Sequence, residues 1–140
     1  MAETVSDVWF SYLESRIFTL VKTEMKQKYP DVNYTSKSTS AAISQFPTIV
    51  IKEIDQRELG MDLDNTTVNA VRETIQIEVY SDQNTSSECE SLSRQAFMVM
   101  KKLRFNGTGR GILFRDGDIW ERADTFVRVI GNGDKDLVTH

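Results

Sequence analysis

The feature that most constrains the fold is a strand followed directly by a helix, between Val68 and Phe105. From Val71 to Tyr80 apolar residues alternate with polar ones, a period of two that buries one face of a strand and leaves the other to water or a partner. After a polar turn at 81–84, apolar residues recur at three- and four-residue spacing and predict an amphipathic helix. A strand and a helix joined this closely should pack on each other. The predicted inward positions are Ile75, Ile77 and Val79 on the strand, and Cys89, Leu92, Ala96, Val99, Met100 and Leu103 on the helix.

Two overlapping capping-box pairs, Thr85 with Glu88 and Ser87 with Glu90, predict where this helix starts. The single cysteine, Cys89, lies on the apolar stripe of the helix and has no second cysteine with which to form an internal disulfide. The helix interior offers nothing that would lower the pKa of a thiol. We therefore interpret Cys89 as a small core residue.

The remaining elements are predicted from breaks and periods along the chain. A first amphipathic helix should run from Thr4 or Ser6 to about Tyr29, because Pro30 disfavours helix at the residue before it. Strands are predicted at 31–36, 46–54 and 125–130, and the dipeptide Asp116-Gly117 predicts a tight hairpin after a glycine-rich connector at 106–111. Residues 55–69 lack a clear period and predict an extended hairpin loop. The final residues 131–140 have few apolar anchors and predict a flexible tail.

These elements predict an α+β fold: an antiparallel sheet of about four strands plus a hairpin, with two helices packed on one face. A chain of 140 residues is long enough to bury one core and lies within the usual size of a single domain. We expect one domain that spans residues 1–140.

Charge and hydropathy exclude several classes of function. The net charge of −4 argues against a general polyanion binder, which needs clustered lysine and arginine. No apolar run is long enough to cross a bilayer, and the first thirty residues are too polar and acidic for a secretory signal, so we expect no membrane partner. The acidity is local, because residues 52–82 contain eight acidic and three basic residues.

The sequence shows none of the residue arrangements that typically carry catalysis or bind a cofactor. The only histidine, His140, is the last residue and has no nucleophile or orienting acid nearby in the sequence. The segment 62–65 is similar to the start of a calcium loop, but Thr67 stands where that loop needs glycine. Gly107, Gly109 and Gly111 follow a helix and precede a strand, the reverse of the order in a phosphate cradle. We expect no enzyme, no metal and no cofactor.

Basic and aromatic residues alternate after the second helix, which is one signal of a nucleic-acid platform. An amphipathic strand at the end of a helix gives the same pattern, and Asp116 and Asp118 dilute the positive charge, so we favour the second interpretation. The residues concerned are Arg104, Phe105, Arg110, Phe114 and Arg115.

The polar face of the 71–80 strand is the most informative surface in the sequence. It is a mixed, hydrogen-bonding surface on a sheet whose other side carries both helices, and a one-sided sheet in a small chain favours contact with another subunit. The candidate subunit interface consists of Arg72, Thr74, Gln76, Glu78 and Tyr80.

Several segments and their order resemble the tail terminator, or tail completion, proteins of long-tailed bacteriophages and related contractile particles. After an opening amphipathic helix come FPTIVIKEID at 46–55 and a polar loop that leads to VRETIQIEVYSDQ at 71–83. The helix ECESLSRQAFMVMKKL at 88–103 and a closing strand that ends in RVIG at 128–131 complete the resemblance, which covers most of the chain.

The resemblance implies a structural ring, usually a hexamer, that caps the tail tube, ends its polymerisation and joins it to a head-side connector or stopper protein. It implies assembly in the host bacterial cytoplasm, a place in the tail or neck of the virion, and DNA that passes through the lumen without sequence-specific binding. An acidic wall that does not grip phosphate suits such a lumen. The candidate lumen or tube-facing loop contains Glu53, Asp55, Arg57, Glu58, Met61, Asp62 and Asp64.

Two alternatives to a tail terminator are left open by the sequence. One is another neck or head-completion protein of the same kind of particle, which would bind portal-side partners without capping a tube. The other is a small non-enzymatic α+β module with a ligand-binding or regulatory role, which would be a monomer or dimer with a defined pocket.

Overall fold

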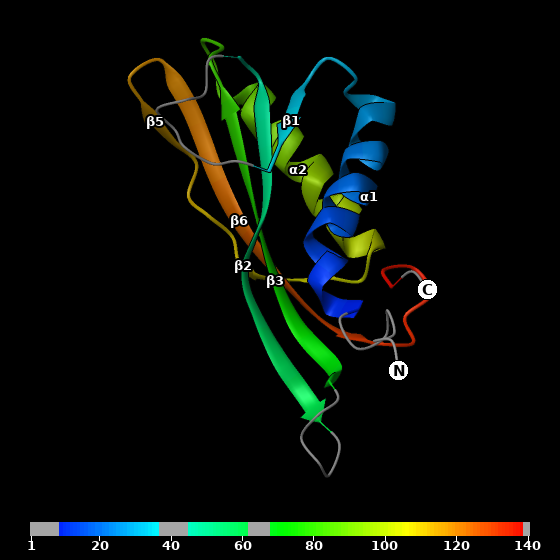
Figure 1. Ribbon diagram of the computed structural model, residues 1–140. Coiled ribbons are helices and arrows are strands. Elements are labelled where there is room, and N and C mark those ends of the chain that lie inside the picture. The colour runs from blue at the N-terminus through cyan, green and yellow to red at the C-terminus, as the bar shows by residue number, and fades with distance from the viewer. Residues whose placement is uncertain (1–8, 37–44, 62–67, 139–140) are drawn as a thin grey trace.

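Two helices cover one face of a six-stranded mixed sheet in the part of the chain that the computed structural model describes, residues 9–36, 45–61 and 68–138 (Figure 1). The α+β class is therefore as predicted. In chain order the elements are the 3-10 turn η2 (Trp9–Tyr12), α1 (Leu13–Lys28), β1 (Asn33–Thr35), β2 (Thr48–Met61), β3 (Val68–Ser81), α2 (Ser87–Lys102), β4 (Asn106–Gly109), β5 (Phe114–Asp116) and β6 (Ile119–Gly131).

The sheet has the strand order β1-β2-β3-β6-β4, and β5 also pairs with β6. Strand β1 runs parallel to β2, while the other pairs are antiparallel. The predicted purely antiparallel sheet of about four strands plus a hairpin is therefore wrong in detail. Parallel neighbours need a crossover in place of a tight turn, and a connection of that kind leaves no short sequence signal.

The prediction of an extended loop at 55–69 is also wrong, because most of these residues belong to the strands of a long β-hairpin. Strand β2 continues to Met61 and β3 begins at Val68, while residues 62–67 lie outside the described chain. A β-bulge between Glu53 and Asp55 shifts the register of β2 against β3. A bulge inserts an extra residue and interrupts the period of two, which explains why the sequence of β2 does not look like one continuous strand.

The two predicted helices are present, with differences at their starts. Helix α1 ends at Lys28, just before Pro30, and its predicted caps at Thr4 and Ser6 lie outside the described residues. Helix α2 has Ser86 as its N-cap and no side-chain capping hydrogen bond, so the predicted capping boxes do not form. The Glu88 carboxylate instead accepts a hydrogen bond of 2.7 Å from the Ser81 hydroxyl and ties the helix to the end of β3.

The core lies between the helices and the sheet. Cys89 is fully buried there, as predicted, and burial raises the pKa of its thiol to about 11. The residues after β6 also reach the core: Leu137 and Val138 are buried, and Asp134 pairs with Arg128. Residues 132–138 therefore have more anchors than the sequence suggests, and residues 139–140 lie outside the described chain. Fully buried apolar side chains include Leu13, Ile17, Met25, Ile49, Ile51, Ile75, Ile77, Leu92, Met100, Phe105, Phe126 and Ile130.

The glycine-rich connector at 106–111 forms part of the sheet, since Asn106–Gly109 is strand β4 on the edge of β6. Gly111 then passes so close to β6 that a Cβ atom would lie 1.9 Å from the Ala123 carbonyl oxygen. Its amide donates to the Asp124 carboxylate at 2.7 Å. The predicted turn at Asp116-Gly117 joins β5 to β6, and Gly117 has the positive φ of 63° that such a turn uses.

Candidate interaction face of the sheet

The face of the sheet opposite α1 and α2, called the open face below, carries all five residues of the predicted subunit interface. Side chains alternate between the two faces along a strand, and Ile75, Ile77 and Val79 of β3 are buried on the helix side. Their neighbours therefore lie on the open face, and the strand register adds the paired positions of β2 and β6. The open face consists of Thr48, Val50, Lys52, Asp55, Arg57 and Leu59 of β2, Arg72, Thr74, Gln76, Glu78 and Tyr80 of β3, and Glu121, Ala123, Thr125, Val127 and Val129 of β6.

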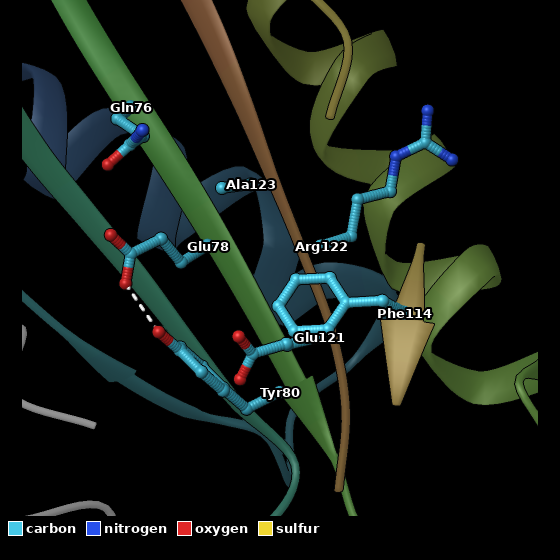
Figure 2. Close-up of a pocket in the computed structure, with 7 residues that line it drawn as sticks. All are labelled: Gln76, Glu78, Tyr80, Phe114, Glu121, Arg122 and Ala123. Carbon is cyan, nitrogen blue, oxygen red and sulfur yellow. Dashed lines mark hydrogen bonds between the residues drawn. The ribbon is translucent and has the colours of Figure 1, made fainter. Parts of the chain in front are cut away.

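One end of the open face is hollowed by a cavity of about 210 Å³ (Figure 2). At its floor the Tyr80 hydroxyl donates a hydrogen bond of 2.7 Å to one carboxylate oxygen of Glu78, and the Lys52 ammonium lies 2.8 Å from the other. Burial, followed by this hydrogen bond, raises the pKa of Tyr80. The residues that line the cavity are Gln76, Glu78, Tyr80, Phe114, Glu121, Arg122 and Ala123.

Glu121 is the unneutralised acid of this cavity. Within the described chain it makes no hydrogen bond or ion pair, and Figure 2 shows the Arg122 side chain pointing away from it. Burial and then the nearby carboxylates of Asp116 and Glu78 raise the pKa of Glu121. Phe114 of β5 stands opposite Glu121 in register and is 47% exposed. This acidic end, meaning Glu78, Tyr80, Phe114 and Glu121, therefore presents negative charge beside an accessible aromatic ring.

The other end of the open face is basic. Arg57 of β2 and Val129 of β6 stand directly opposite Arg72 of β3. The Arg57 guanidinium contacts the Asp55 carboxylate at 2.9 Å, whereas Arg72 is exposed and makes no ion pair within the described residues. Val129 is 57% exposed. This basic end, meaning Arg57, Arg72 and Val129, also combines charge with an accessible apolar side chain.

The predicted lumen-facing loop does not form one surface in the structure. Asp55 and Arg57 lie on the open face of strand β2, whereas Glu53 pairs with the inward residue Ile75 and belongs to the helix side. Glu58 is exposed and stands opposite Val71. Met61 is the last residue of β2, and Asp62 and Asp64 lie outside the described residues.

A buried carboxyl cluster on the helix side of the sheet is not among the sites predicted from the sequence. Glu73 is fully buried, and the Gln56 side-chain amide donates to Glu53 and to Glu73 at 3.3 Å each and to the Phe10 carbonyl at 3.0 Å. The Glu14 carboxylate of α1 accepts the Glu53 backbone N–H at 2.8 Å. Burial, followed by hydrogen bonding to Glu53, raises the pKa of Glu73 to about 9, which keeps it protonated at neutral pH. In the sequence, Glu73 lies in phase with the inward residues Val71 and Ile75 of β3. An acidic residue at an inward position of a strand was the sequence signal that could have predicted this buried carboxyl group.

The arginines after α2 do not form a free basic platform. Arg104, Arg110 and Arg115 lie 3.0, 4.0 and 3.9 Å from the carboxylates of Asp136, Asp124 and Asp118 respectively. Phe105 is fully buried. The paired cations and the buried Phe105 fit the amphipathic-strand interpretation, whereas the other ring of the pattern, Phe114, is 47% exposed.

A second cavity of about 350 Å³ lies near the end of α1 and the start of α2. Val32 and Leu92 contribute apolar surface to it, and Glu88 contributes a carboxylate. Among the described residues, no group of three histidine, cysteine, aspartate or glutamate side chains is placed to hold a metal ion. No described helix has the length and apolar character needed to span a membrane.

Comparisons with protein-family models and with curated proteins find no match to this sequence.

Proposed function

We propose that this protein is a structural subunit of a ring that caps a phage-type tail tube, ends its polymerisation and joins it to a head-side connector. The observation that carries the proposal is the one-sided sheet, whose helix-free face has chemically different ends. A closed ring uses unlike surfaces on each subunit, because one patch meets a different patch on the next copy. The acidic and basic ends of the open face meet this requirement.

The edge of β2 also supports a role in assembly. Strand β1 pairs only with Thr48–Val50, so residues 51–61 of β2 have no strand partner on that side within the described chain. Exposed edges of this kind are surfaces to which another chain can add. The Glu14 carboxylate occupies one backbone N–H of this edge, that of Glu53. We propose that the remainder of this edge pairs with a neighbouring subunit or with the tube.

The β2–β3 hairpin supplies the proposed tube or lumen contact. Figure 1 shows its far end extending past the helices. Asp55, Arg57 and Glu58 lie on the β2 arm of this hairpin, which belongs to the acidic 52–82 segment. On the described part of this far end the charges of Asp55 and Glu58 balance those of Arg57 and Arg72. A lumen wall without an excess of positive charge would let DNA pass without binding its phosphates. The hexamer, the tube protein and the connector as partners, and the virion neck as location, follow from the family resemblance and are part of the proposal.

The proposal is tested by native mass spectrometry and negative-stain images of the purified chain, alone and with tubes assembled from the tail tube protein. We expect sixfold rings, or monomers that form rings on tube ends, and tubes that stop growing when the protein is added. A monomer that leaves tube length unchanged contradicts the proposal. A variant with Asp55 and Glu58 both changed to lysine should still fold and should cap tubes less well, with Glu90→Lys on α2 as the matched control.

A ligand-binding or regulatory module is the second candidate, favoured by the 350 Å³ cavity beside Leu92. In that case the chain stays a monomer or dimer, ignores tubes, and gains thermal stability from a small molecule in a metabolite screen. Another neck or head-completion protein would bind a head-side connector and leave tube growth unaffected, so the tube assay also separates this alternative.

A further inference from the structure

We propose that the acidic end of the open face on one copy receives Arg72 of the next copy in the assembly. The contact itself needs no more than a second copy of this chain. Only the closure of such contacts into a ring rests on the proposed function. The Arg72 contact specifies which two patches of the open face meet.

The basic end carries a charge arrangement that is unfavourable in a single copy. Arg57 and Arg72 stand directly opposite each other on neighbouring strands, and like charges in that position destabilise a sheet. Asp55 neutralises Arg57 at 2.9 Å, but Arg72 has no anionic partner within the described chain. A carboxylate supplied from outside would relieve the repulsion.

At the acidic end a carboxylate lacks a cation in the part of the chain that the structure describes. Lys52 and Tyr80 satisfy Glu78, whereas Glu121 faces Glu78 and Asp116 and has no cation beside it in the described residues. The cavity of about 210 Å³ is open beside Glu121. A guanidinium placed there would meet the carboxylate and could lie against the face of the Phe114 ring, since arginine both pairs with acids and stacks on aromatic rings.

The two ends cannot satisfy each other within one copy. Arg72 and Tyr80 lie eight positions apart on the same strand, which places the two ends about 27 Å apart at about 3.4 Å per residue. An arginine side chain is much shorter than this distance. The described chain therefore does not supply the complementary charge to either end, and a second copy of this chain carries it in the right setting.

Each end also pairs its charge with an exposed apolar neighbour. Val129 stands beside Arg72 and Phe114 beside Glu121, each in direct register. Contact between the two ends would remove both apolar surfaces from water and lower the local dielectric constant around the ion pair, which strengthens the pair. In a closed ring each copy gives Arg72 to one neighbour and its acidic end to the other.

The test uses two charge-reversal variants, Arg72→Glu and Glu121→Arg, alone and mixed, with assembly measured by sedimentation velocity at low and high salt. Each variant alone brings like charges together, so the apparent dissociation constant of the assembly should rise by about tenfold. An equal mixture restores opposite charges at every contact, and assembly should return to the wild-type level. High salt should reduce the difference between the variants and the wild type.

Arg94→Glu is the matched control, because Arg94 is exposed on α2, on the opposite side of the sheet. It makes the same charge change and should leave assembly unchanged. Rings that form equally from every variant overturn the Arg72 contact and leave the ring intact. A wild-type dimer with the mixing behaviour above supports the contact and overturns the ring, because two copies placed face to face can satisfy both ends together.

A second measurement works even if the purified chain is monomeric. Acetyl-arginine amide at low salt should shift the backbone amide signals of Glu121 and Ala123 in NMR spectra of the wild-type protein. Glu121→Gln should weaken this binding by about threefold, as expected for the loss of one partly exposed ion pair. Equal shifts in the wild type and the variant, or none in either, overturn the inference.

Discussion

The two faces of the sheet differ in residue type and in burial, although the same strands form both. On the helix side of β3 and β6 the apolar positions include fully buried ones, such as Ile75 and Phe126. The charged positions of β6 on that side are paired within the chain, as at Asp124, which contacts Arg122 at 3.3 Å. On the open face the same strands alternate threonine, glutamine and charges with a few exposed apolar residues. Packing against α1 and α2 determines the first set. The fold places few demands on the exposed members of the second set, such as Arg72 and Val129, so their arrangement is evidence about what the protein meets.

The largest expected effect separates the faces on a single strand. Phe126 of β6 is 1% exposed and packs with its ring centroid 6.0 Å from that of Phe97. Phe126→Ala should lower the free energy of unfolding by about 4 kcal/mol, because it removes buried apolar surface and leaves a cavity. Val129→Ala, three residues further on the same strand, should change it by less than about 0.5 kcal/mol. Urea denaturation of both variants measures the contrast, and equal losses would show that something in the isolated chain covers the open face.

How far the sequence predicts this contrast can be seen strand by strand. The alternation from Ile75 to Val79 and the stripe on α2 predict the helix side well, because core packing imposes a period on residue type. The continuation of β2 to Met61 is hidden, since the bulge at Glu53 breaks the period. The parallel pairing of β1 is a contact between segments separated along the chain, and it leaves no local pattern.

The candidate interface is predictable to the same extent. Its five β3 residues follow from the alternation, and the structure places all of them on the open face. The neighbours of these residues on adjacent strands cannot be predicted from the alternation. The strand register brings Phe114 and Glu121 to one end of the open face and Arg57 to the other, and the sequence of a single strand does not reveal these pairings. The bulge likewise separates Glu53 from Asp55, so a cluster of acids in the sequence divides between two faces.

The second prediction concerns Glu73, the polar exception on the helix side. Its pKa is raised from 4.5 to about 9 in the folded protein, so between these values the folded state holds a proton that the unfolded state has released. The stability contribution is therefore fully present below pH 4.5 and is lost as the pH rises towards 9. Glu73→Gln cannot ionise and should be more stable than the wild type at pH 8.5 by about 2 kcal/mol. Urea unfolding at pH 5, 7 and 8.5 tests this.

The control for Glu73 is Glu58→Gln, which removes an exposed carboxylate from the β2 arm of the same hairpin. It should follow the wild-type pH dependence closely. The contradicting outcome is a stability that rises between pH 5 and 8.5 by the same amount in the wild type, Glu58→Gln and Glu73→Gln. That result would show that Glu73 is not protonated in the core.

A smaller effect is expected for the best-formed polar contact of the open face. Glu78 accepts a hydrogen bond from Tyr80 and lies 2.8 Å from Lys52, with its side chain only 11% exposed. Glu78→Gln keeps the shape but removes the charge, and should cost about 1 kcal/mol in thermal or urea unfolding. Asp118→Asn removes the carboxylate of a solvent-exposed pair with Arg115 and should cost nothing measurable. Equal effects would mean that the open face makes no ordered polar contacts of its own.

The smallest effect has the opposite sign and bears most directly on the purpose of the open face. Arg72 stands opposite Arg57 and has no anionic partner in the described chain, so Arg72→Thr removes a repulsion and adds a residue that suits strands. The isolated chain should become more stable by about 0.3 kcal/mol, measured as a shift in the urea midpoint at low protein concentration. The same variant should assemble less well, because it lacks the cation for the acidic end of the neighbour. Arg94→Thr should show neither effect, and a variant that is both less stable and fully competent in assembly would assign Arg72 to the fold of the single chain.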